Sequence, residues 1–353
     1  MLLLSQPVAE SKSRAGAPRK STLGMFAAAE IPVIDLLEAE AKNKIVRACR
    51  EFGFFKLVNH GVPLEAMAAR LEEEALKFFN LPQHEKDKAG PPNPFGYGNK
   101  AIGPNGDVGW VEYLLFTTNP DLISPASILP PNSQLFRGLV NEYVGAVKSV
   151  TCEVLEKMAE GLKIGAKNVF SRLIRDERSD SCFRVNHYPP QPDDFHGRRG
   201  MIGFGEHTDP QVVSVGRSNN TTGLQISLRD GTWVSVPPDP RSLFVMVGDS
   251  LQVMTNGRFR SVKHRVVTSS PKAKARVSMI YFGGPPLSEK IVPLTCLMEQ
   301  GEESLYHEFS WSEYKKSAYK TKLSENRLSL FEKNKFPTPP NPSNNPSSSK
   351  FLL

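Results

Sequence analysis

The strongest constraint on the fold is a change of sequence pattern near residue 180. From there to about residue 285, short β-like runs alternate with turn residues. The runs cover 183–188, 212–215, 224–228, 233–236, 243–247, 251–254, 265–268 and 277–282. Short strands with turn signals about every 8–12 residues are typical of a sandwich or jelly roll rather than of a parallel sheet.

The regions on either side of this β-like part have helical periodicity, with apolar residues spaced three and four positions apart. Helices are predicted over 38–52, 63–80, about 133–162 and 311–331. Two short apolar runs, 31–35 and 53–58, predict strands within the first half. The predicted fold class is therefore α+β, with a jelly-roll core between helical segments.

Composition argues against several classes of protein. Six of the seven net positive charges lie in residues 1–29 and 333–353, so the body lacks the basic groove of a nucleic-acid-binding protein. The chain has no run of 18 apolar residues, which argues against a membrane-spanning helix. The four cysteines form no CxxC pair, so we expect free thiols and a reducing compartment, the cytoplasm and also the nucleus. We expect a monomer or a weak homo-oligomer.

Among the seven histidines, only His207 begins a His-x-Asp triplet, His207-Thr208-Asp209, whose spacing suits chelation. On an extended segment, residues i and i+2 share a face, so the imidazole and the carboxylate can meet one ion. By itself such a triplet is a weak signal, and a structural role is the more frequent explanation. His264 follows in a later β-like run. Two histidines and one carboxylate form the facial triad of non-haem Fe(II), and zinc is the alternative metal.

A predicted core strand carries an arginine and a serine two positions apart, Arg276 and Ser278. A guanidinium and a hydroxyl on one face can hold a small carboxylate. An exposed arginine on an edge strand is the alternative, but the intervening Val277 favours a buried strand, in which an arginine needs an anionic partner. Asn186 and Tyr188 end another strand and could add hydrogen bonds to the same acid.

The order of these residues resembles that of the Fe(II)/2-oxoglutarate-dependent dioxygenases. Residues 31–36 and 51–63 are similar to the N-terminal module of the plant branch. Three further segments resemble the gibberellin 2-oxidases that act on C19 gibberellins, namely 103–115, 217–226 and 279–287. One departure is Gly216, where that subfamily usually has leucine.

The resemblance covers about residues 30–330 and implies a double-stranded β-helix (jelly-roll, cupin-like) core. The implied division has five parts: a disordered extension (1–29), a helical N-terminal module (30–178), the jelly-roll core (179–285), a C-terminal helical segment (286–332) and a disordered Pro/Asn/Ser tail (333–353). The tail composition cannot bury enough apolar surface to order itself.

The resemblance also implies the chemistry: Fe(II) as the metal, with 2-oxoglutarate and dioxygen as cosubstrates. The implied metal ligands are His207, Asp209 and His264. The far carboxylate of 2-oxoglutarate is then expected to meet Arg276, Ser278 and Tyr188, with Asn186 near its keto acid end. The implied reaction is the 2-beta-hydroxylation that inactivates a gibberellin.

Such a substrate is a rigid apolar diterpenoid with a carboxylate, which suits an apolar cavity with few polar anchors. Arg184 lies two residues before Asn186 and is the first choice for the substrate carboxylate, with Arg217 second. Tyr113 and Leu115 are predicted for the apolar wall. Three alternatives stay open: a dioxygenase for another gibberellin carbon or another plant small molecule, a zinc hydrolase, and a non-enzymatic jelly-roll interaction protein.

Overall fold

The computed structural model describes residues 31–91, 95–102, 106–118, 133–192, 201–268 and 274–333. The predicted disordered extension (1–29), and the predicted tail from residue 334 onwards, lie outside these residues. Within them, no helix is both long enough and apolar enough to cross a membrane.

The largest element is an eight-stranded sheet with the order β1-β2-β10-β7-β12-β5-β4-β3. In that order its strands are β1 (Val33–Asp35), β2 (Phe54–Val58), β10 (Leu243–Val247), β7 (Val213–Ser218), β12 (Arg276–Gly283), β5 (Cys182–Tyr188), β4 (Val108–Thr117) and β3 (Gly96–Ala101). All its pairings are antiparallel except that of β1 with β2.

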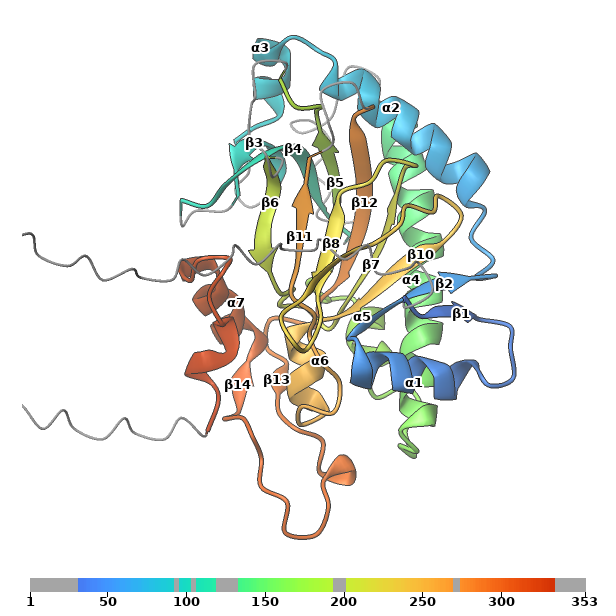
Figure 1. The fold of residues 1–353 in the computed structure, drawn as a ribbon, viewed down its shortest axis with the longest axis vertical. Helices are drawn as coiled ribbons and strands as arrows, with labels where there is room; N and C mark the ends of the chain where they lie inside the picture. Colours follow the sequence, from blue (N-terminus) through green and yellow to red (C-terminus); the bar gives the residue numbers. More distant parts are fainter. Residues whose placement is uncertain are drawn as a thin grey trace, which may run out of the picture.

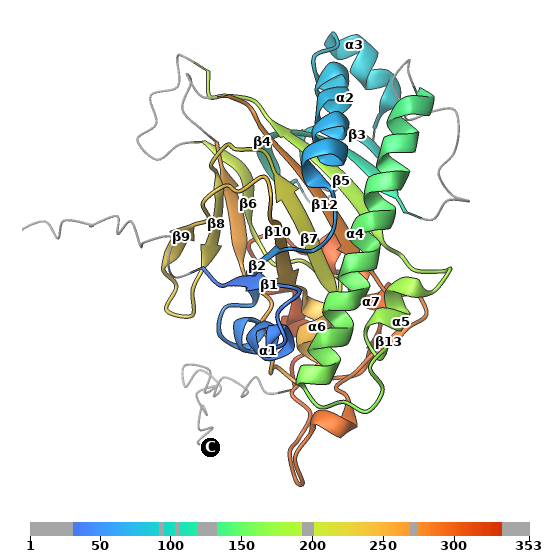
Figure 2. The same cartoon turned by 90° about the vertical axis from the view of Figure 1, so that its right-hand side faces the viewer.

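A smaller antiparallel sheet lies against one face of the large sheet, as Figure 2 shows. Its order is β6-β11-β8-β9. The four strands are β6 (Ile202–His207), β11 (His264–Val267), β8 (Leu224–Ser227) and β9 (Trp233–Ser235). Two facing antiparallel sheets of short strands form the predicted jelly-roll core, so the predicted fold class is confirmed.

The described helices are α1 (Ala41–Glu51), α2 (Ala69–Phe79), α3 (Gln83–Lys86), α4 (Ser133–Gly161), α5 (Ser171–Arg175), α6 (Asp249–Met254) and α7 (Trp311–Lys320), with a π-helical turn at Leu64–Ala68. Of these, α1, α2 and α4 cover the other face of the large sheet, as Figures 1 and 2 show. The long helix α4 packs along the sheet and contacts β7 and β12. A capping box of Ser310 and Glu313 starts α7.

The alternation of side chains along the strands separates a packing face from a cavity face. On β12, Val277, Met279 and Tyr281 are buried in the main apolar core under the helices. The intervening Arg276 and Ser278 face the space between the two sheets, where they line a cavity. The same strand therefore stabilises the fold on one side and builds a site on the other.

Several sequence predictions of secondary structure are wrong. Residues 251–254, predicted as a strand, form part of α6, because a short apolar run does not distinguish a strand from a buried helix. The last predicted helix, 311–331, ends at Lys320, and only a 3₁₀ turn at Arg327–Leu330 follows it. The C-terminal segment also contains a small hairpin of β13 (Lys290–Ile291) and β14 (Phe309–Ser310).

Strand β6 was not expected, because its glycines look like turn residues. The structure gives Gly203 a different role, since a Cβ atom there would lie 2.8 Å from the Tyr188 ring. The glycine thus permits the close approach of β5 and β6, a known use of glycine inside a strand. The N-terminal module contributes four strands to the large sheet, of which β1 and β2 were predicted and β3 and β4 were not.

Candidate active site

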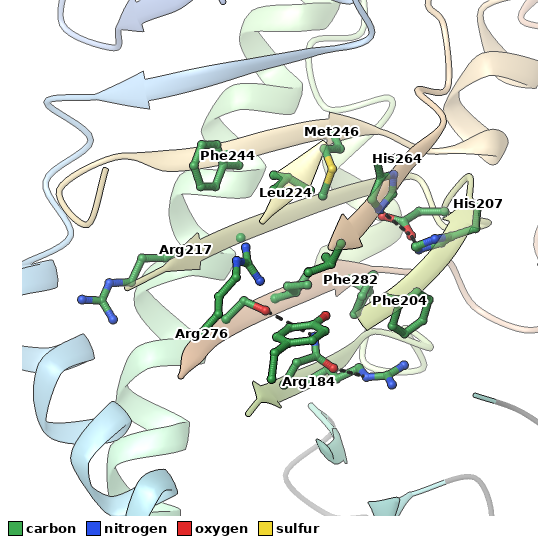
Figure 3. A pocket seen from close by; sticks show the side chains of 17 residues that line it. Arg184, Phe204, His207, Arg217, Leu224, Phe244, Met246, His264, Arg276 and Phe282 are labelled. Carbon is green, nitrogen blue, oxygen red and sulfur yellow. Dashed lines mark hydrogen bonds and ion pairs between the residues drawn. The ribbon is translucent and has the colours of Figure 1, made fainter. Parts of the chain in front are cut away.

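Three predicted metal ligands meet at one end of the cavity. His207 ends β6 and His264 begins β11, and the two residues are directly opposite partners in the antiparallel register. Their rings therefore lie on the same face, with centroids 4.2 Å apart. Asp209 completes the group, and one ligand atom from each residue lies within 4.8 Å of the others. Figure 3 shows the side chains of His207 and His264 lying close together.

The tautomers of both histidines suit a metal ion. The ring nitrogen Nδ1 of His207 lies 2.8 Å from the Gly205 carbonyl, and that of His264 lies 3.1 Å from the Val262 carbonyl. Because a carbonyl oxygen only accepts, each Nδ1 carries the proton and each Nε2 keeps its lone pair. These Nε2 atoms lie 3.4 Å and 3.8 Å from Asp209 Oδ1.

The charge states of His207 and Asp209 also favour the binding of a metal ion. Burial, together with the neighbouring His264, lowers the pKa of His207 to about 4, so this imidazole is neutral at neutral pH. Burial alone would raise the pKa of Asp209, but the two imidazoles and a hydroxyl together hold it below its usual range. A neutral imidazole and an ionised carboxylate thus lie beside the His264 ring, which is an arrangement that fits a cation.

The hydroxyl beside Asp209 belongs to Ser214, a residue that the sequence reasoning missed. Ser214 Oγ donates to Asp209 Oδ2 over 2.5 Å, which leaves Oδ1 facing the histidines. Ser214 lies on β7, five residues after the carboxylate, and is fully buried. Hydrogen bonds of this kind fix the orientation of a metal ligand.

The loop between the first two ligands is held by residues far away in the sequence. Thr208 Oγ1 and the Tyr314 hydroxyl both donate to Asp249 Oδ2, over 3.1 Å and 2.6 Å. The backbone N–H of Asp249 donates to the Asp209 carbonyl over 2.7 Å. Helices α6 and α7 thus hold the metal-binding loop through one buried carboxyl group, whose pKa is raised by burial.

We expect Tyr314→Phe to lower the free energy of unfolding by about 1–3 kcal/mol, because Asp249 loses a buried hydrogen-bond donor. The affinity for Fe(II) is expected to fall about tenfold, the lower end of the effect of outer hydrogen-bond partners. Urea unfolding and Fe(II) titration measure the two quantities. Tyr306→Phe is the control, because that hydroxyl accepts from Gln252 and does not touch the loop. An equal loss of Fe(II) affinity in both variants would contradict the positioning role.

At the other end of the cavity, β12 and β5 bring the predicted carboxylate-binding residues together. Arg276 pairs with Tyr188, and Ser278 pairs with Asn186. Arg276 is only 5% exposed, and its Nε and Nη1 atoms have no hydrogen-bond partner among the described residues. Burial lowers the pKa of this guanidinium. A buried arginine without an acidic neighbour calls for an anionic ligand, so the site fits a carboxylate.

A second arginine faces the same cavity. Arg184 Nε donates to Asn186 Oδ1 over 2.7 Å, and Asn186 Nδ2 reaches Ser278 Oγ at 3.4 Å. The guanidinium carbon of Arg184 lies 3.7 Å from the centroid of the Tyr113 ring. The buried Nη2 atom of Arg184 has no partner in the part of the chain that the structure describes. Asn186 therefore connects two regions of the cavity, and the arginine in each region has buried nitrogen atoms without a hydrogen-bond partner among the described residues.

The other residues predicted to contact the substrate differ in their position relative to the cavity. Neither Tyr113 nor Leu115 is among the residues that line the cavity, although the Tyr113 ring contacts the guanidinium of Arg184 and Leu115 is the register partner of Arg184. Arg217 lines the cavity. Its Nη1 atom is engaged in an ion pair with Glu72 Oε2 on α2, at 2.8 Å. Figure 3 shows its side chain turned away from the other arginines of the cavity.

The cavity wall between these polar groups is apolar. Both sheets contribute to it, with Phe204, Leu224, Phe244, Met246, Val266, Ile280 and Phe282. None of these residues was singled out from the sequence. These residues share an inward-facing position on a strand. The sequence alone does not identify such positions, because the register decides which face of a strand points inward.

Comparisons with known proteins agree with this geometry. Residues 179–285 match the 2OG-Fe(II) oxygenase superfamily, and residues 31–134 match the family described as non-haem dioxygenase in morphine synthesis N-terminal. The crystal structure of JOX2 in complex with 2OG, Fe and JA is similar, with a TM-score of 0.74 and 27% identity over 86% of this chain and 89% of that one. The fold and the site define an Fe(II)- and 2-oxoglutarate-dependent oxygenase.

Sequence relatives narrow the family. A gibberellin 2-beta-dioxygenase of Phaseolus coccineus is 62% identical over 94% of this chain and 99% of the relative. Gibberellin 2-beta-dioxygenase 1 of Pisum sativum is 56% identical over the same shares. The chain belongs to the gibberellin 2-beta-dioxygenase family.

Proposed function

We propose that this protein hydroxylates C19 gibberellins at the 2-beta position and thereby inactivates the hormone. In this reaction one dioxygen and one 2-oxoglutarate are consumed, and succinate and carbon dioxide are released with the hydroxylated product. The observation that carries the proposal is a cavity with two chemically different ends, the triad of His207, Asp209 and His264 at one and the unpaired Arg276 at the other. The names of the relatives support the choice of substrate and of carbon 2.

The proposed roles follow from these positions. The triad holds Fe(II), which supplies the oxidising chemistry when bound. Arg276 and Ser278 bind the far carboxylate of 2-oxoglutarate, and Tyr188 borders the same site. Asn186 is assigned to orienting Ser278 and Arg184, because it has a hydrogen-bond contact with each.

The substrate carboxylate is assigned to Arg184. This assignment is supported by its unpaired Nη2 atom and by the Tyr113 ring that stacks on its guanidinium. The apolar wall of the cavity suits the hydrocarbon skeleton of a diterpenoid. A carboxylate bound on one side of an apolar skeleton fixes which carbon faces the metal, so the arginine also contributes to regiochemistry.

The direct test is an Fe(II)- and 2-oxoglutarate-dependent assay over a panel of gibberellins, with products identified by mass spectrometry. We expect 2-beta-hydroxylated C19 gibberellins and one succinate for each product formed. Hydroxylation at another carbon would overturn the substrate assignment. Activity with zinc and without 2-oxoglutarate would favour a hydrolase, and absence of turnover with every compound would favour an interaction protein.

We expect Arg184→Gln to raise the KM for the gibberellin about tenfold, because a charge-assisted hydrogen bond to the substrate carboxylate is lost. The KM for 2-oxoglutarate is expected to stay nearly constant. Arg258→Gln is the matched control, because that arginine pairs with Glu302 and does not line the cavity. The KM for a gibberellin methyl ester should be the same in the wild type and in Arg184→Gln. A tenfold difference in the KM for the ester would contradict the assignment.

We also propose a cytoplasmic and nuclear location and a monomeric or weakly self-associating state, without nucleic-acid or membrane partners. The near-neutral body between basic ends and the four free cysteines support this proposal. The proposed units are 30–178, 179–285 and 286–332. Imaging of a fluorescent fusion and size-exclusion chromatography test the location and the oligomeric state.

A further inference from the structure

The floor of the cavity contains a strip of small residues on β7. Ser214, Gly216 and Ser218 occupy alternate positions, whereas Val213 and Val215 on the other face of the strand are buried in the core under the helices. Gly216 lines the cavity together with the metal triad and Arg276. The strip therefore borders the cavity. That this cavity binds a ligand is indicated independently by Arg276, which is 5% exposed and has buried nitrogen atoms without a hydrogen-bond partner among the described residues.

The two serines fix the position of Gly216 along the cavity. Ser214 donates to Asp209, so it lies at the metal end. Ser218 is the register partner of Ser278, so it lies at the end where the far carboxylate is assigned. A dicarboxylic acid stretched between these ends passes beside Gly216 with its middle carbons.

The space at Gly216 is open towards the cavity. The three nearest atoms to a Cβ atom built there would be Ile280 Cγ1 at 3.4 Å, the Met279 carbonyl oxygen at 3.6 Å and Ile280 Cγ2 at 3.9 Å. These are ordinary contacts with the neighbouring strand, and β7 has an extended conformation at this residue. Neither packing nor the backbone requires a glycine, so its effect is to leave room in the binding site.

We propose that Gly216 is a specificity-determining residue that lets the cosubstrate site accept 2-oxo dicarboxylates with a branch on the carbon next to the far carboxylate. This inference rests on the proposed function, because that function assigns the two ends of the cavity to metal and carboxylate. A larger side chain at this position would fill the space that the branch needs. One extra methyl group in a filled site costs about 10- to 200-fold in discrimination.

The test uses three stable analogues of 2-oxoglutarate: N-oxalylglycine and the two enantiomers of N-oxalylalanine. The alanine compounds carry a methyl group next to the far carboxylate and are otherwise identical. Calorimetry on the Fe(II)-loaded protein in the absence of oxygen gives a Kd for each analogue. The quantity compared is the ratio of the Kd of each N-oxalylalanine enantiomer to the Kd of N-oxalylglycine. We expect the wild type to bind one enantiomer within about threefold of N-oxalylglycine, and Gly216→Leu to raise this ratio more than about tenfold.

Two further variants keep the result interpretable. Gly216→Ala adds only the Cβ atom that the structure accommodates, and it should give an intermediate ratio. Gly138→Leu places the same substitution on the exposed side of α4 and should leave the ratio unchanged. Equal ratios in the wild type and both Gly216 variants, or rejection of both enantiomers by the wild type, would overturn the inference. Failure of the wild type to bind N-oxalylglycine would contradict the proposed function itself.

Discussion

We expect His264→Ala to lose Fe(II) binding and to lower turnover more than about a hundredfold. Even the hydrogen-bond partners of metal ligands typically contribute about 10- to 100-fold, so a ligand must contribute more. His264 is buried and lies directly opposite His207, so its removal leaves one imidazole and one carboxylate at the site. The fold should remain, because the side chain faces the cavity and not the main core.

The measurement combines metal content, Fe(II) titration and succinate release. His60→Ala is the matched control, because His60 is a buried histidine that accepts from the Val62 N–H and lies outside the cavity. That variant should lose stability and keep both iron and turnover. If His264→Ala bound stoichiometric iron and had normal turnover, the assignment of the metal site to the triad would be contradicted.

The sequence identifies the residues of the site better than their surroundings. His207 and Asp209 are recognisable because they are two residues apart on an extended segment, and strand alternation alone places both on one face. Arg276 and Ser278 follow the same rule within an apolar run. Such local patterns carry their geometry with them, so they can be predicted without knowledge of the register.

Long-range partners have no such local signal. Tyr314 and Asp249 are 65 positions apart in the sequence, and only the packing of α7 against α6 brings their oxygens to 2.6 Å. Arg217 is a related case. It lines the cavity, but the sequence does not reveal that its guanidinium pairs with Glu72, which lies 145 positions earlier in the chain.

The second large effect is expected at the opposite end of the cavity, for Arg276→Met. Loss of one partner of a buried, hydrogen-bonded charge pair costs about 2–5 kcal/mol, so the KM for 2-oxoglutarate should rise more than about thirtyfold. Arg276→Lys should be intermediate, because an ammonium keeps the charge but cannot reproduce the two parallel hydrogen bonds of a guanidinium. Methionine fills a similar volume and avoids a cavity next to Tyr188.

The saturation curve for 2-oxoglutarate at fixed gibberellin, repeated for gibberellin at saturating 2-oxoglutarate, separates the two carboxylate sites. Arg276→Met should change the first KM and Arg184→Gln the second, although one asparagine contacts both regions. Arg260→Lys is the control, because that partly buried arginine donates to backbone carbonyls outside the cavity. Unchanged 2-oxoglutarate saturation in Arg276→Met would mean that its unpaired nitrogens serve another anion, since a buried guanidinium still requires one.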